Sequence, residues 1–187
     1  MMKRILLTLS IFIFSFSLMN ANTHFGYESK NAYSTSKSNG SIVKYLGEVY
    51  LGESFCIVDA ESRFNIHTVH GVKIGDYFSA GIGTGVDIYY EDDLEYSMMQ
   101  IPIFLNVKGY LPLSQKVSLY ASMDGGKTFG VGDSSGLTSW MYVPAVGVKI
   151  KFINIQLGYV LQRYTIKELD WRNIDGDALQ LKVGFVF

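Results

Sequence analysis

The chain has 187 residues, a formal net charge of −1 and 18% charged residues. This length is enough for one domain with a sizeable core. The near-neutral charge gives no electrostatic case for binding nucleic acid or an anionic membrane surface. A single cysteine, Cys56, excludes an intramolecular disulfide. Frequent glycine, rare proline and 14% aromatic residues favour a curved β-sheet over helices.

The first residues have the order of a secretory signal peptide. Lys3 and Arg4 precede an apolar run that ends at Leu18, and the small residue Ala21 follows. The run of about 14 residues is shorter than the ~20 that a membrane-spanning helix needs. We therefore predict that residues 1–21 are a signal peptide, removed after Ala21.

Residues 22–41 are rich in Ser, Asn, Thr and Lys and show little periodicity, which predicts a flexible periplasmic leader. From residue 42 to residue 187 every second residue is apolar, which indicates β-strands. Eight runs show this alternation, and no Asp, Glu, Lys or Arg stands on their apolar face. The runs are Tyr45–Leu51, Phe64–Val72, Phe78–Ile88, Ile101–Val107, Val117–Met123, Trp140–Ile150, Ile155–Leu161 and Leu179–Phe187.

The two faces of these runs differ in the size of their residues. The apolar face has large side chains, about four per strand, which is too much volume for the interior of an eight-stranded barrel. The interleaved face has charged, amide and small residues, which fit a crowded lumen. Apolar side chains outside and polar ones inside are typical of a transmembrane barrel. The sequence thus predicts an all-β fold: a closed, antiparallel, up-and-down transmembrane β-barrel of eight strands.

The connections between the runs alternate in length. Short ones are expected near Gly75–Asp76, Pro112–Lys116 and Ile153–Asn154. Long ones are expected at Cys56–Ser62, Glu91–Ser97, Gly130–Thr138 and Thr165–Asp177. Short periplasmic turns and longer outer loops are the rule in outer-membrane barrels. An even strand number then puts both termini in the periplasm.

Seven charged residues on the interleaved face form a predicted polar network in the lumen. Two interpretations remain: a hydrogen-bonded plug that makes the barrel rigid, and a gated ion path. The plug is favoured because side chains fill the interior of an eight-stranded barrel. The seven residues are Lys44, Glu48, Asp87, Lys108, Asp124, Lys149 and Lys182.

Other candidate residues favour structural roles. His67 and Ser79 both face inward, but a structural hydrogen bond is favoured over a catalytic pair. His70 falls on the apolar face and is not assigned to a metal. The glycines at 81, 83 and 85 lie within a strand, so close packing against Tyr50 or Phe104 is favoured over a phosphate loop.

Two acidic loop regions and the C-terminus complete the set of candidates. The loop residues Asp92, Asp93, Trp171 and Asp175 are candidates for binding a surface partner or cation, although solvated loops are favoured. The last strand alternates up to a terminal phenylalanine. With a signal peptide, Phe185 and Phe187 resemble the C-terminal sorting signal that the barrel-assembly machinery reads.

The strand motifs resemble a known family. Thr68–Gly75, the glycine-spaced Ala80–Val86, Ile101–Val107 and Val143–Val148 are similar to strands of the small outer-membrane β-barrel domain proteins of Bacteroidetes-type bacteria. More distantly the chain resembles the OmpA-like and OmpX-like barrels of the porin-like superfamily. The resemblance covers residues 42 to 187 and implies the fold. It transfers no catalytic or binding residue.

The sequence therefore predicts a non-enzymatic protein of the bacterial cell envelope, without cofactor or metal. Its predicted role is structural, or one of surface interaction through the outer loops. The expected partners are outer-membrane lipid or lipopolysaccharide and the assembly machinery, with no nucleic acid. A narrow pore for small solutes and a lipid-modifying enzyme remain as alternatives, and a soluble ligand-binding barrel is the architectural rival.

Overall fold

The computed structural model describes residues 43–57, 62–90, 96–132, 135–166 and 173–187. At 96–97, 165–166 and 173–175 only the backbone is described. The predicted signal peptide and the leader, residues 1–21 and 22–41, lie outside these ranges. Among the described residues, no helix has the length and apolar character to span a bilayer.

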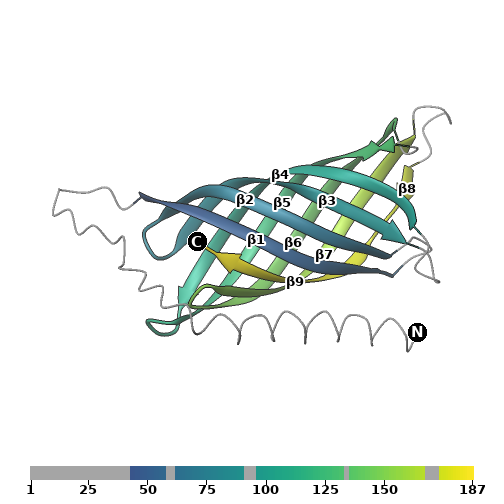
Figure 1. The fold of residues 1–187 in the computed structure, drawn as a ribbon. Helices are drawn as coiled ribbons and strands as arrows, with labels where there is room; N and C mark the ends of the chain where they lie inside the picture. The colour runs from purple at the N-terminus through teal and green to yellow at the C-terminus, as the bar shows by residue number, and fades with distance from the viewer. Residues whose placement is uncertain (1–42, 58–61, 91–95, 133–134, 167–172) are drawn as a thin grey trace, which may run out of the picture. The chain divides into compact units, whose positions relative to one another are not determined.

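Antiparallel strands make up nearly all of the described chain (Figure 1). They are β1 (Val43–Cys56), β2 (Ser62–Ile74), β3 (Phe78–Tyr90), β4 (Tyr96–Pro112), β5 (Val117–Val131), β6 (Leu137–Ile150), β7 (Ile153–Ile166), β8 (Asn173–Asp175) and β9 (Ala178–Val186).

The strands close into a ring. Consecutive strands pair from β1 to β7, and β9 pairs with both β1 and β7. The short β8 pairs with β7 just beyond the stretch that β9 covers, so β8 and β9 act as one interrupted strand of the wall. The fold is therefore the predicted closed, up-and-down barrel of eight strands, in which no long strand has a free edge.

The polarity of the barrel confirms the predicted orientation of the two faces. Leu105 and Leu181 are 62% and 40% exposed on the outer surface, whereas Lys108 and Lys182 are 0% and 3% exposed in the lumen. Strand alternation explains why leucines lie outside and lysines inside, because neighbouring residues point to opposite faces of a sheet. An apolar exterior around a polar interior is the arrangement of a transmembrane β-barrel.

Several strands are longer than predicted, which corrects the expectation of an outer face without charge. β5 runs beyond Met123 to Val131, and β7 runs beyond Leu161 to Ile166. Their outward residues therefore include Lys127 and Arg163, both exposed. These charges interrupt the alternation of hydropathy, although the backbone pairing continues.

The connections alternate in length as predicted. Those at 75–77, 113–116 and 151–152 have two to four residues, and we call this side of the barrel the turn end. Those at 57–61, 91–95, 132–136 and 167–172 have five or six, and they define the loop end. The turn expected at Ile153–Asn154 is at Lys151–Phe152, where Lys151 has a φ of 54°. Lysine is not among the residues that signal a turn in a sequence, so the position of this turn was not recognisable.

Glycines let large lumen aromatics approach the wall, as predicted for Gly83. A Cβ at Gly83 would lie 2.3 Å from the Phe104 ring, and one at Gly184 would lie 2.4 Å from the Tyr50 ring. At Gly85 the close neighbour is instead the backbone of Ile66, at 2.0 Å.

We expect Gly83→Ala to lower the free energy of unfolding by about 1–3 kcal/mol, because the added methyl group overpacks this contact. The Phe104 ring has little room to turn away, since it also packs against His67, with the ring centroids 5.4 Å apart. The measurement is reversible urea unfolding in lipid vesicles. Gly109→Ala is the matched control, because nothing lies within 4 Å of a Cβ at Gly109. An equal loss for both variants would contradict the packing argument.

Candidate functional site: a polar network inside the barrel

The candidate site is the lumen itself, which polar side chains fill from the walls. Every full-length strand contributes, because its inward positions alternate with the outward apolar ones. Among them are six charged side chains that are almost completely buried: Glu48, Arg63, Asp87, Lys108, Asp124 and Lys182. Buried charges are expensive unless they are paired and hydrogen-bonded, so the partners of these six decide what the lumen does.

The group nearest the turn end is centred on an ion pair. Lys108 on β4 donates to the Glu48 carboxylate on β1 and to the Tyr50 hydroxyl, the latter at 2.7 Å. Asn154 on β7 donates to Glu48 at 2.9 Å and to Tyr50 at 2.8 Å. The Lys108 ammonium also lies 5.0 Å from the centre of the Tyr50 ring. This cation is therefore neutralised, hydrogen-bonded and covered by an aromatic ring.

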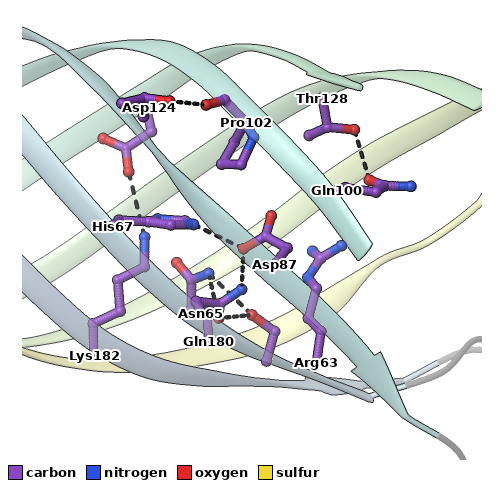
Figure 2. A network of polar contacts seen from close by, with 12 residues as sticks. Arg63, Asn65, His67, Asp87, Gln100, Pro102, Asp124, Thr128, Gln180 and Lys182 are labelled. Atoms are coloured by element: carbon purple, nitrogen blue, oxygen red, sulfur yellow. Dashed lines mark hydrogen bonds and ion pairs between the residues drawn. The ribbon is translucent and has the colours of Figure 1, made fainter. Parts of the chain in front are cut away.

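The middle group contains two carboxylates with cationic or imidazole partners (Figure 2). Lys182 on β9 lies 3.7 Å from the Asp124 carboxylate on β5, which also accepts a hydrogen bond from Asn106. The other carboxylate, Asp87, lies 2.8 Å from His67 Nε2.

A series of hydrogen-bonded amide and hydroxyl side chains on three strands extends the middle group. Asn65 on β2 donates to Asp87 at 2.6 Å, and its carbonyl oxygen accepts from Ser54 on β1 at 2.8 Å. Gln180 on β9 donates to the Ser54 hydroxyl at 3.0 Å. Figure 2 shows Asn65 and Gln180 close together, with Asp87 beside Asn65. These hydrogen bonds fix the orientation of the Asn65 amide, whose oxygen accepts from Ser54 while its nitrogen donates to Asp87.

The group nearest the loop end surrounds a buried arginine. Arg63 Nη1 on β2 donates to the Tyr89 hydroxyl at 2.6 Å and to the amide oxygen of Gln162 on β7. The Tyr89 and Tyr164 hydroxyls are 3.0 Å apart, and Gln100 accepts from Tyr89 at 3.1 Å. Arg63 Nε and Nη2 are buried without a hydrogen-bond partner among the described groups.

The seven predicted lumen residues are placed differently. Glu48, Asp87, Lys108, Asp124 and Lys182 are buried in the network described above. Lys149 is half-buried at the turn end, and Lys44 is exposed, which differs from the expectation of a lumen position. The reason is the stagger of the strands: the pairing with the β9 segment begins at Gly47, which bonds to Phe187, so the wall is incomplete beside Lys44.

The predicted loop and C-terminal residues are only partly described. Asp92, Asp93 and Trp171 lie outside the described residues, and Asp175 is described only as backbone in β8. The terminal Phe187 exchanges two backbone hydrogen bonds with Gly47, of 3.1 and 2.9 Å, and both Phe187 and Phe185 are exposed on the outer face. Their role as a sorting signal stays a prediction.

Sequence reasoning missed Arg63, and it placed His70 on the outer face without its hydrogen-bond partners. Arg63 shares the parity of Asn65 and His67 but lies one position before the first apolar residue of its predicted run. Extending the run by one residue finds it. His70 is outward and exposed, and its two ring nitrogens lie 2.6 Å from the Tyr45 hydroxyl and 3.0 Å from the Thr68 hydroxyl. These hydroxyls satisfy the imidazole on an otherwise apolar surface.

His67 and Ser79 do not form a pair. Ser79 lies 3.3 Å from the Tyr110 hydroxyl, while His67 bonds to Asp87. Within the part of the chain that the structure describes, no three His, Cys, Asp or Glu side chains are grouped so as to hold a metal ion. The described geometry thus offers hydrogen bonds and ion pairs across the lumen, and His67 and Ser79 have separate partners.

No protein-family model and no curated protein matches the sequence. Solved structures of similar shape include the N-terminal β-barrel domain of Pseudomonas aeruginosa OprF, with 14% identity over 79% of this chain and 99% of that one, at a TM-score of 0.46. Neisserial surface protein A has 14% identity over 79% and 98%, at a TM-score of 0.48. The Yersinia pestis outer membrane protein Ail has 11% identity over 77% and 100%, at a TM-score of 0.44.

Proposed function

We propose that this protein is a non-enzymatic barrel of the bacterial outer membrane whose lumen is closed by its polar network. Its role is structural, or one of surface interaction through the connections at the loop end. In this proposal both termini and the turn end face the periplasm. The observation that carries it is the set of ion pairs and hydrogen bonds that join distant walls of the barrel.

The exterior supports a membrane location. Large apolar side chains are exposed on every full-length strand, among them Ile82, Ile103, Leu119, Val146 and Leu157. In water, molecules with such a surface would aggregate, whereas the hydrocarbon of a membrane solvates it. Closed barrels satisfy the strand hydrogen bonds that lipid cannot, and antiparallel barrels of this kind are typical of outer membranes.

The cross-lumen contacts support a plug over a pore. Lys182 and Asp124 lie on β9 and β5, three places apart in the ring, as do Lys108 and Glu48 on β4 and β1. Tyr89 and Tyr164 join β3 and β7, which face each other across the ring. These contacts cross the bore at different heights, where eight strands leave little space for water.

The conductance of the purified protein in planar bilayers tests the proposal. We expect no discrete current steps from the wild type, because opening the bore requires separating several buried pairs at once. Lys182→Ala combined with Asp124→Ala removes one bridge from both sides and should introduce brief, small openings. Asp76→Ala is the control, since it removes an exposed carboxylate from an ion pair at the turn end. Reproducible discrete steps from the wild type would establish the pore alternative instead.

A further inference from the structure

A cation stands on the lipid-facing surface near the loop end. Lys127 points outward from β5 between Gly125 and Phe129 and is exposed. In the sheet register its neighbours are Ile103 on β4 and Trp140 on β6. A lysine on the lipid face is unfavourable at the bilayer centre and costs little near an interface, where the ammonium reaches the headgroups. Lys127 therefore indicates the level of a headgroup region.

Trp140 holds this ammonium in place. The Lys127 Nζ atom lies 4.4 Å from the centre of the Trp140 ring, a cation–π contact. Among the described residues, no carboxylate lies within ion-pair distance of Lys127. On the other side of Trp140, Arg163 of β7 is its partner in the register, and its guanidinium is 3.0 Å from Asp177. Arg163 therefore has a carboxylate partner, whereas Lys127 faces outward without one among the described side chains.

An apolar groove of about 450 Å³ runs beside this cation. It exists because Gly125 has no side chain on the outer face, between the longer neighbours Leu105 and Tyr142 on the adjacent strands. Beside Lys127, the outward lining of the groove is Ile82, Ile103, Leu105, Gly125, Phe129 and Trp140. An apolar groove with an ammonium and an indole in its lining matches an acyl chain joined to an anionic headgroup.

We propose that this surface binds lipopolysaccharide, with an acyl chain of lipid A in the groove and a lipid A phosphate on Lys127. Phosphate monoesters have about −1.5 to −2 charges at neutral pH, more than the single charge of a phospholipid diester, and so complement the ammonium better. The assignment to the outer leaflet rests on the proposed function, in which the loop end faces outward. The site lies on the outer face of β3–β6 and is separate from the lumen network.

Quenching of Trp140 by brominated lipid tests the site. The chain has two tryptophans, so the full-length Trp171→Phe variant leaves Trp140 as the only reporter. The variant is reconstituted in phosphatidylcholine vesicles containing brominated phosphatidylglycerol, which quenches Trp140 when it occupies the groove. Diphosphoryl lipid A and unbrominated phosphatidylglycerol then compete separately. We expect lipid A to relieve the quenching at a mole fraction about fivefold lower than phosphatidylglycerol.

Lys127→Gln in the same background should remove this preference, while Lys116→Gln, a change of an exposed lysine at the turn end, should retain it. Both variants should fold, because neither side chain is buried. Equal competition by the two lipids would overturn the assignment to lipopolysaccharide in favour of phospholipid. A preference that survives Lys127→Gln would overturn the site itself. Neither result alters the conductance test, so a failure here is distinct from a failure of the proposed function.

Discussion

Replacing Glu48 with alanine is expected to lower the free energy of unfolding by about 3–5 kcal/mol, because it leaves a buried lysine without its counter-charge. Glu48 and Lys108 are both 0% exposed and contact each other directly. After the change Lys108 retains the Tyr50 hydroxyl and ring and the Tyr120 ring, 5.5 Å from its Nζ atom, and none of these neutralises an ammonium. Asn154 loses one of its two acceptors as well. Reversible urea unfolding in lipid vesicles measures the loss.

Two comparisons separate this effect from a general loss of packing. The double variant Glu48→Ala, Lys108→Met removes both charges and should be more stable than Glu48→Ala alone, since no unpaired charge remains. Asp76→Ala breaks the 3.7 Å pair between the exposed Asp76 and the half-buried Lys73, and should cost less than about 1 kcal/mol. A double variant as unstable as the single one would show that the buried pair is not the source of the loss.

Leu105→Arg is expected to lower the free energy of unfolding in vesicles by about 2–4 kcal/mol, the cost of a charge on the lipid-facing side near the bilayer centre. Leu105 lies near the middle of β4, between Ile82 on β3 and Gly125 on β5, and its side chain points outward. Hydrocarbon does not solvate a guanidinium, and Leu105 lies two register positions deeper from the loop end than Ile103, the partner of Lys127.

The matched control is Leu113→Arg. Leu113 is 58% exposed, nearly the same as the 62% of Leu105, but it lies in the turn after β4. In a membrane the first change should be costly and the second should cost less than about 1 kcal/mol. In water both changes are at exposed sites and should be nearly neutral. Two equal, small effects would therefore contradict a membrane location.

The lumen charges show how much of the site was predictable. Alternation in β4 and β9 puts Lys108 and Lys182 on the same side as Asn106 and Gln180, opposite a row of Val and Leu residues. This is enough to predict that both lysines face the lumen, and both do. It does not predict their partners. Lys108 bonds to Glu48, 60 residues away, and Gln180 bonds to Ser54, 126 residues away.

By itself the sequence determined the polarity of the two faces, the number of strands in the wall and the alternation of connection lengths. These follow from a period of two within each strand, which is a local property of the chain. Only the tertiary structure decided which charges meet, why Lys44 is exposed, and that Lys127 and Arg163 face outward. The physical reason is that the stagger between strands and the point where each pairing ends depend on closure of the whole ring, which no single strand specifies.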